Sequence, residues 1–388
     1  MADPRLAART REVEPFHVMV ISAKVFELMA QGRDVIVMVA GEPDFGTPPA
    51  AVEAATKAIA NGKVRYTASP GIDPLRSAIA GYYGERFDVD LPASRVMVTT
   101  GASSALLLAL AAIVERDAEV LLADPGYPCN RHFARIYEGR AVNLPVGSET
   151  NYQLSADLVE ANWSYRTTGV LLATPSNPTG TIVRPAELAA IADVVAERRG
   201  TLFVDEIYGE LVYDLAPQTV LSHTNDAFVI NSFSKTFGMT GWRLGWLVVP
   251  EWALDAVDRL AQNMYISAPA ASQAAGLACF SPEVWAIVAE RREQFRERRD
   301  VLIAGLRDIG FKVPVVPEGA FYVYADCSAF TDDSYRFCLD LLEHAGVGCT
   351  PGIDFGTYLA DRHIRFSYTC SPARIVEALA RIWEFVGR

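Results

Sequence analysis

The sequence has little of what marks membrane, secreted and nucleotide-binding proteins. Its longest apolar run, Ala105–Val114, is far shorter than the roughly 20 residues that span a bilayer. Residues 1–11 are charged and contain no apolar core of a signal peptide. No Gly-x-Gly-x-x-Gly follows a first strand, and no Gly-x-x-x-x-Gly-Lys-Ser/Thr occurs. We therefore expect a cytoplasmic protein with no membrane partner and without these two nucleotide-binding motifs.

Cysteine and histidine are also scarce, with six and five residues among 388. No two cysteines are two residues apart and no His–Cys cluster has zinc-like spacing, so no metal site is predicted. Scattered cysteines are typical of small buried side chains in a reducing compartment. Positive charge is in deficit, because the net charge is −12 and the pI is near 5.0. An acidic surface repels phosphate backbones, so nucleic acid is not an expected partner.

The length of the chain favours two domains over a single core. In residues 46–283, short apolar runs alternate with amphipathic helical stretches, which predicts an α/β domain with a mostly parallel sheet. Residues 284–388 predict a smaller α+β domain, and residues 1–45 a segment that packs with it. The charged stretch from about Val284 to Leu306 is interpreted as the solvated face of a long helix. The expected strands are Val96–Thr100, Val120–Ala123, Val170–Thr174, Leu202–Asp205, Phe228–Ser232 and Leu244–Val249 in the large domain, and Phe321–Ala325, Val347–Thr350 and Ile364–Thr369 in the small one.

Polar side chains follow four of these strands at the point where each strand ends. Asn177 follows the strand at 170–174, and Asp205 ends the strand at 202–205. Lys235 follows the strand at 228–232, and the segment Gly101–Ser104 follows the strand at 96–100. Because the carboxyl ends of parallel strands form the ligand-binding edge of doubly wound sheets, we expect these groups to share one cleft. Each alone is also explained as a helix cap, a solvated lysine or a turn, but together they favour a functional site.

Three motifs carry a resemblance to a known family. They are Asp205-Glu-Ile-Tyr208, Ser232-Phe-Ser-Lys235 and Gly241-Trp-Arg243, and the match extends from Gly41-Glu-Pro-Asp to Arg365-Phe-Ser-Tyr368. The chain resembles the class I/II aminotransferases of pyridoxal-phosphate (PLP) fold type I, most closely their bacterial aspartate aminotransferase-like branch. The resemblance implies a seven-stranded, mostly parallel sheet and ping-pong transfer of an α-amino group from an L-amino acid to a 2-oxo acid. A C–S lyase similar to cystathionine β-lyase, or a decarboxylase, is the alternative on the same fold.

The resemblance assigns cofactor roles to several of these residues. Lys235 would carry PLP as a Schiff base and then shuttle the Cα proton as a neutral amine, which requires a lowered pKa. Asp205 would keep the pyridine nitrogen protonated, and Tyr208 and Asn177 would hydrogen-bond the ring oxygen. Tyr127 would stack on the ring, although simple packing after a strand explains this tyrosine equally well.

The phosphate group of PLP needs hydrogen-bond donors, and the resemblance points to a second set of residues. The backbone N–H groups of Ala102 and Ser103 lie at an expected helix start, where the helix dipole favours an anion. The Ser232 hydroxyl and the Arg243 guanidinium would add further donors. Tyr66 would reach the phosphate of a neighbouring subunit, which implies a homodimer with shared active sites.

By the same resemblance, the substrate would meet Gly41, Asn177 and Arg365. Arg365 would bind the α-carboxylate through parallel hydrogen bonds, unless it is a strand arginine paired with an internal acid. Family members that prefer dicarboxylic substrates often carry a lysine at the position of Ser103, and residues 261–269 contain no Lys or Arg. No cation is then left for a second carboxylate, which predicts a neutral aliphatic or aromatic substrate. Glutamate and 2-oxoglutarate are expected to serve as a second pair through rearranged contacts.

Overall fold

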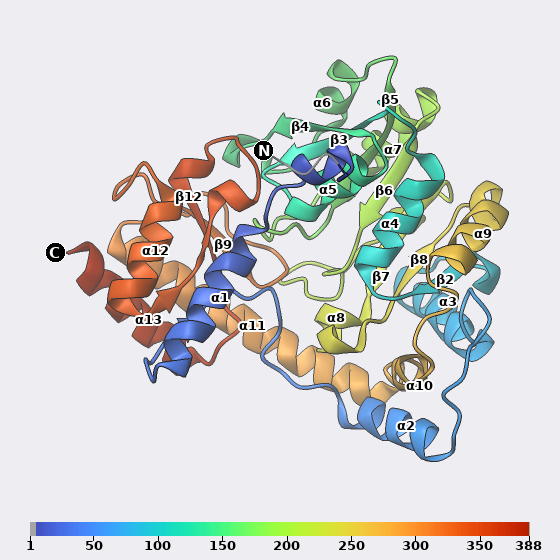
Figure 1. The fold of residues 1–388 in the computed structure, drawn as a ribbon, viewed down its shortest axis with the longest axis horizontal. Helices are drawn as coiled ribbons and strands as arrows, with labels where there is room; N and C mark the ends of the chain where they lie inside the picture. Colours follow the sequence, from blue (N-terminus) through green and yellow to red (C-terminus); the bar gives the residue numbers. More distant parts are fainter. Residues whose placement is uncertain (1–4, 388) are drawn as a thin grey trace.

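The computed structural model describes residues 5–387, which form two units joined by a long helix (Figure 1). Met1–Pro4 and Arg388, at the ends of the predicted segment 1–45 and domain 284–388, lie outside the described residues. In Figure 1 the unit with the main sheet lies to the right, and the smaller unit, with α12 and α13, lies to the left. None of the helices in residues 5–387 combines the length and the apolar character of a membrane span.

The main sheet has seven strands in the order β2-β8-β7-β6-β5-β3-β4. The five strands β7, β6, β5, β3 and β4 pair in parallel. Strand β8 runs antiparallel to both of its neighbours, β7 and the edge strand β2. Residues of β2, β6, β7 and β8 are buried throughout, which explains their continuous apolar character. The predicted mostly parallel seven-stranded sheet is confirmed. The strands are β2 (Val96–Thr99), β3 (Glu119–Asp124), β4 (Arg140–Pro145), β5 (Thr167–Ala173), β6 (Thr201–Asp205), β7 (Ala227–Ser232) and β8 (Gly245–Val248).

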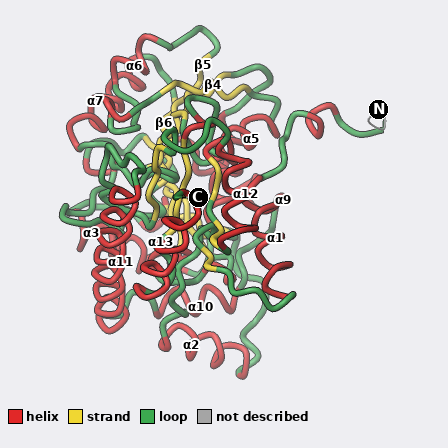
Figure 2. The backbone as a smooth tube through the Cα atoms, turned by 90° about the vertical axis from the view of Figure 1, so that its left-hand side faces the viewer, coloured by secondary structure: helices red, strands yellow, loops and turns green. Residues whose placement is uncertain are grey.

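Helices cover both faces of this sheet, because alternate side chains of each strand point to opposite faces. Figure 2 shows the strands in the middle of the molecule with helices on either side. One face packs against α4 (Ala102–Ile113), α5 (Pro128–Ile136) and α9 (Leu254–Met264). The other face packs against α2 (Pro49–Ala60), α3 (Asp73–Phe87), α6 (Ala156–Ala161), α7 (Pro185–Glu197) and α10 (Ala270–Ala278). The short helix α8 (Phe233–Thr236) follows β7 directly.

The smaller unit contains two small sheets. Strand β12 (His363–Ser367) lies between β11 (Thr350–Pro351) and β9 (Tyr322–Asp326) in an antiparallel sheet, and β1 (Ile36–Val37) pairs in parallel with β10 (Val347–Gly348). The expected single strand Val347–Thr350 is therefore wrong, since its two halves belong to different sheets. The helices are α1 (His17–Ala30), α11 (Pro282–Ile309), α12 (Ser334–Ala345) and α13 (Pro372–Val386).

The N-terminal segment shares a core with the C-terminal residues. Ile21 and Val25 of α1 and Ile36 of β1 belong to the same buried cluster as residues of α11, α12 and α13. Outside this cluster, Asp34 forms ion pairs with Arg374 and Arg381 of α13. We propose on this basis that residues 5–45 form one unit with residues 284–387. Short 3₁₀ turns complete the chain at Ala8–Arg11, Ala93–Arg95, Ser148–Thr150, Val220–Ser222, Thr240–Trp242, Glu251–Ala253, Gly352–Asp354 and Ala360–Arg362.

The charged stretch on α11 is only partly the solvated surface that the sequence suggested. Arg298 and Arg299 are 4% and 5% exposed. Arg298 donates to Asp44 at 2.7 Å, and Arg299 donates to Asp214 at 3.1 Å. Buried arginines of this kind are tolerated because acidic partners and aromatic rings surround the guanidinium groups. The six cysteines are free thiols, and Cys129 and Cys370 are only partly buried.

Candidate active site

A cavity of about 440 Å³ lies at the carboxyl ends of the main strands. Asp205 ends β6, Lys235 lies in α8 after β7, and Asn177 follows β5. Ala102 and Ser103 begin α4 after β2, and α1 and the smaller unit supply the remaining wall. The sheet topology therefore brings the amine and the carboxylate, thirty positions apart, to one cavity. Of the predicted site residues, the lining includes Gly41, Ala102, Ser103, Tyr127, Asn177, Asp205, Tyr208, Lys235, Arg243 and Arg365.

Lys235 is held inside the cavity by its backbone and by one hydrogen bond. The Ser232 hydroxyl caps the start of α8 by accepting from the Ser234 N–H at 3.1 Å, which fixes the turn that carries the lysine. The Lys235 Nζ donates to the Gly41 carbonyl oxygen at 2.5 Å. Burial lowers the pKa of Lys235 to about 8, against the opposing charge of Glu42. A substantial fraction of this amine is therefore neutral near pH 8.

Asp205 is a buried carboxylate that would be stabilised by a cation. Its Oδ1 accepts from the Ile207 N–H at 3.1 Å. Burial raises the pKa of Asp205 to about 7, and the hydrogen bond from Ile207 and the charge of Lys235 only partly oppose this. A protonated ring nitrogen beside this carboxylate would restore its ionised form, since an opposite charge favours ionisation.

Tyr208 and a residue that sequence reasoning missed, Tyr322, form a hydrogen-bonded pair. Their hydroxyl oxygens are 2.8 Å apart, and both side chains are buried. Burial raises the pKa of both tyrosines above the ordinary value, so both remain neutral donors and acceptors. A Cβ on residue 41 would lie 3.0 Å from the Tyr322 hydroxyl, so the glycine leaves space beside this pair. Tyr322 lies in an apolar strand of the smaller unit, so no local sequence signal marks it.

Arg365 lies against two aromatic rings. Its guanidinium carbon lies 4.4 Å from the Tyr322 ring centre and 4.9 Å from the Phe355 ring centre. Its Nη1 donates to Asn177 Oδ1 at 2.9 Å, and its Nη2 donates to the Val39 carbonyl at 2.7 Å. These acceptors are uncharged, so the alternative of an internal acid partner is not what the structure shows. Arg365 Nε is buried and has no partner among the described residues, which leaves a donor for an anionic ligand.

Gly101 and Arg243 form a compact cradle beside the start of α4. Gly101 has a φ of 87°, and a Cβ at this position would lie 2.6 Å from Arg243 Nη2. Glycine at position 101 therefore allows the guanidinium to approach the backbone that precedes α4. Arg243 Nη1 donates to the Thr240 carbonyl at 2.8 Å. A guanidinium and helix N–H groups facing one space are suited to bind a phosphate.

Two predicted site residues do not line the cavity. Ser232 is fully buried, and its hydroxyl donates to the Leu244 carbonyl at 2.9 Å. Ser234, two residues later, lines the cavity instead. Tyr66 lies on a loop before α3 and is 84% exposed. The roles of Ser232 and Tyr66 stay predictions.

The sequence matches the family model of aminotransferase class I and II over residues 33–382. The chain belongs to this family. The aminotransferase is 40% identical to the valine--pyruvate aminotransferase of Mycobacterium tuberculosis, over 96% of this chain and 97% of that relative. A crystal structure of an aminotransferase from Mycobacterium tuberculosis matches with a TM-score of 0.96 at 39% identity, covering 99% of this chain and 100% of that one. The aspartate aminotransferase of Thermus thermophilus with maleate matches with a TM-score of 0.93 at 32% identity, covering 99% and 100%.

These relatives confirm the predicted fold type and class of reaction. The aminotransferase has PLP fold type I, depends on PLP and transfers amino groups between amino acids and 2-oxo acids. The lyase and decarboxylase alternatives are not favoured, because the relatives are named as aminotransferases.

The residues around the cavity fit the cofactor. A buried carboxylate with a raised pKa, a buried amine with a lowered pKa and a cradle that admits only glycine match a cationic ring, a carbonyl and a phosphate. Asp205, Lys235 and the Arg243 cradle are the groups that would hold these three parts. Bound PLP supplies an electron sink that stabilises negative charge at the substrate Cα.

Proposed function

We propose that this aminotransferase exchanges the amino group of a neutral L-amino acid with a 2-oxo acid in a ping-pong cycle. The proposal rests on the wall of the cavity, which is apolar and has few cationic side chains. No Lys or Arg lines the described cavity except Lys235, Arg243 and Arg365. A second substrate carboxylate would have no cationic partner, and burying an unpaired charge is costly. The apolar side chains that line this wall are Phe16, Val18, Met19, Phe26, Leu106 and Ile207.

The names of the relatives bear on this choice. The relative from Mycobacterium tuberculosis is named for valine and pyruvate, which both have small uncharged side chains. Another relative, from Aquifex aeolicus, is named as a probable aspartate/prephenate aminotransferase. The uncharged Ser103 at the cavity wall favours the first substrate class for this chain. Glutamate and 2-oxoglutarate are the proposed second pair.

We assign the following roles to the lining residues. Lys235, partly neutral at its lowered pKa, takes the proton from the substrate Cα and would return it to the carbonyl carbon of the cofactor. Arg365 donates to the substrate α-carboxylate, with its free Nε as one donor. Asp205 holds the ring nitrogen protonated, and Tyr208 and Asn177 donate to the ring oxygen.

The first test of this proposal is the substrate profile. We expect kcat/KM for valine or alanine to exceed that for aspartate by roughly tenfold or more, because an unpaired buried charge costs more than about 1.4 kcal/mol. Initial rates with a common 2-oxo acid measure this ratio. An enzyme that prefers aspartate over every neutral amino acid would contradict the proposal.

A charge introduced at Ser103 tests the same wall directly. Ser103→Lys is expected to raise kcat/KM for aspartate by roughly tenfold, because the ammonium group supplies the missing partner. Ser103→Met adds similar length without charge and is the matched control. Equal aspartate activity in the two variants would exclude an electrostatic role for this position.

We further propose a homodimer with shared active sites. Tyr66 is held on a surface loop next to α10, where Gln273 donates to Thr67 Oγ1 at 3.0 Å and accepts from the Ile72 N–H at 2.8 Å. An ordered, exposed tyrosine on an apolar surface is typical of a subunit interface. The exposed apolar residues of this region are Val52, Ile59, Val64, Tyr66, Met264, Ile266 and Leu277.

The dimer is tested by placing a charge on this surface. Ile59→Glu is expected to reduce the solution mass from twice to once the chain mass of 42.3 kDa and to weaken PLP binding. Light scattering measures the mass. Val376→Glu on α13 is the matched control, since the two side chains are 60% and 57% exposed. A wild-type monomer with full activity would refute the shared site.

The free cysteines favour a reducing compartment, and we propose the cytoplasm.

A further inference from the structure

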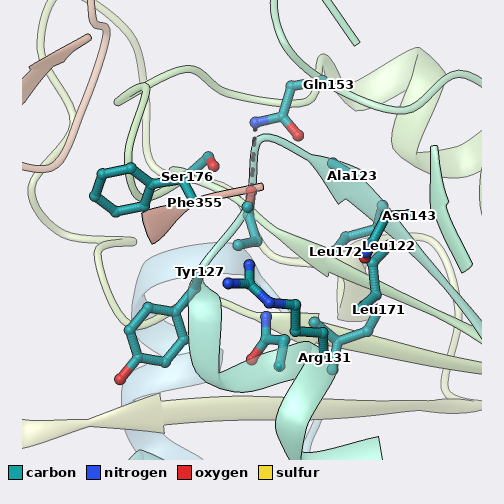
Figure 3. Close-up of a pocket in the computed structure, with 13 residues that line it drawn as sticks. Leu122, Ala123, Tyr127, Arg131, Asn143, Gln153, Leu171, Leu172, Ser176 and Phe355 are labelled. Carbon is teal, nitrogen blue, oxygen red and sulfur yellow. Dashed lines mark hydrogen bonds between the residues drawn. The ribbon is translucent and has the colours of Figure 1, made fainter. Parts of the chain in front are cut away.

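The loop Asp354–Tyr358 of the smaller unit lies against the β3–α5 connection of the larger unit. Figure 3 shows Phe355, Tyr127 and Arg131 around a second, small cavity that adjoins the main one. This cavity is about 30 Å³, so it admits no more than a water or two. The two units are thus closely packed where the proposed cofactor-stacking tyrosine and the loop meet.

Asp124, the last residue of β3, accepts several hydrogen bonds across this junction. Its carboxylate is 3% exposed and lies three residues before Tyr127. It accepts from the Thr357 N–H and hydroxyl, each at 3.0 Å, and from the Tyr358 N–H at 3.3 Å. The backbone of Gly356 approaches so closely that a Cβ there would collide with Asp124 Oδ1. A carboxylate offers two charged acceptor oxygens, whereas an amide of the same size offers one neutral oxygen and would turn its NH₂ donor toward these N–H groups.

The same loop reaches the substrate arginine. Gly126 lies two residues after Asp124, and its N–H donates to the Phe355 carbonyl at 2.8 Å. The Phe355 ring lies against the Arg365 guanidinium, as does the ring of Tyr322. The position of Phe355 is therefore set from the larger unit, although Phe355 and Arg365 both belong to the smaller one.

The loop also fixes the start of α1. Asp354 is 1% exposed, and its two carboxylate oxygens accept from the N–H groups of His17 and Val18 at 2.9 and 3.0 Å. Arg131 of the larger unit donates to the Asp354 carbonyl at 3.2 Å. These contacts place the first turn of α1, which carries part of the apolar cavity wall, against the same loop.

We infer that Asp124 is a positioning residue for the substrate carboxylate. By holding the loop at Thr357 and Tyr358, it keeps Phe355 over Arg365 and the start of α1 at the cavity. Asp124 does not line the main cavity, so it acts on the substrate through the loop. This inference rests on the proposed substrate role of Arg365. Loss of the Asp124 carboxylate is therefore expected to weaken substrate binding more than turnover or PLP binding.

The test is Asp124→Asn in the PLP-loaded enzyme, with the amino acid that the wild type uses best. We expect KM for the amino acid and for the 2-oxo acid to rise tenfold or more, with kcat reduced less than threefold. The inhibition constant of isovalerate, a carboxylate that lacks the reacting amine, should rise by the same factor as KM. The PLP dissociation constant, measured by absorption titration, should change less than twofold. Asp117→Asn, which removes a surface ion pair with Arg140 just before β3, is the matched control.

A milder pair of variants covers the case in which Asp124→Asn does not fold. Thr357→Val removes only the hydroxyl donor to Asp124 and is expected to raise KM about threefold, and Thr357→Ser is expected to restore the wild-type KM. Unchanged KM values in Asp124→Asn and Thr357→Val overturn the inference. Equal losses of kcat, PLP affinity and substrate affinity overturn it as well, because they indicate a general packing role. A wild-type enzyme inactive with all amino acids would instead refute the proposed function.

Discussion

Lys235→Ala is expected to lower kcat/KM for amino transfer by roughly 10⁴-fold or more. General acid–base catalysis alone contributes roughly 10²–10⁴-fold, and the amine also reacts with the cofactor as a nucleophile. Among the described residues that line the cavity, no other side chain carries a primary amine that could replace Lys235. Initial rates at saturating PLP measure the loss.

Lys235→Arg separates the two roles of the side chain. Arginine keeps the positive charge but is never neutral at ordinary pH, so we expect it to be nearly as inactive as alanine. Activity within tenfold of wild type in Lys235→Arg would show that charge, not a neutral amine, is what the site requires. Such a result would contradict the assigned proton transfer.

Asp205→Ala is expected to reduce kcat by roughly 10²–10⁴-fold while the protein retains some PLP. Removing one partner from a buried ion pair costs about 3–5 kcal/mol, and each 1.36 kcal/mol is a factor of ten in rate. The ring nitrogen would lose the carboxylate that keeps it protonated. Single-turnover rates at saturating substrate measure the effect separately from PLP occupancy.

Glu206→Gln provides a matched control, because the adjacent Glu206 is also buried but does not line the cavity. Its Oε1 accepts from the Val220 N–H at 2.8 Å, and burial raises its pKa to about 8. The side chain is therefore largely protonated at pH 7, and a neutral glutamine resembles it closely. We expect kcat within about threefold of wild type. A loss as large as that of Asp205→Ala would show that changing either buried acid at this strand end disturbs the site, which would contradict a specific role of Asp205.

The main sheet could be predicted because its strands are buried on both faces and bounded by turn residues. The apolar runs at Leu202–Asp205 and Phe228–Ser232 needed no tertiary information to be recognised. The antiparallel direction of β8 could not be predicted, since side-chain periodicity is the same in both directions. Strand β4 was missed because it lies at the sheet edge and alternates exposed residues such as Arg140 with buried Leu144.

The site residues at strand ends could also be predicted, because the sheet itself brings them together. Tyr322, in an apolar strand, and Phe355, in a loop, could not, since their contact with Arg365 is defined only by the fold. The buried Arg298 and Arg299 were misjudged for a similar reason. Their acidic partners, Asp44 and Asp214, lie far away in the sequence.

The pairing of β1 with β10 has a consequence for folding during translation. Ile36 lies opposite Val347, 311 positions later in the chain. At roughly 5–20 residues per second, a ribosome needs about 15–60 s after the synthesis of β1 to complete β10. During that interval the apolar face of α1 has no native cover. The unit that contains Arg365 can therefore fold only after nearly the whole chain has been translated. Until then, we expect chaperones to bind mainly the N-terminal segment, whose apolar face is exposed.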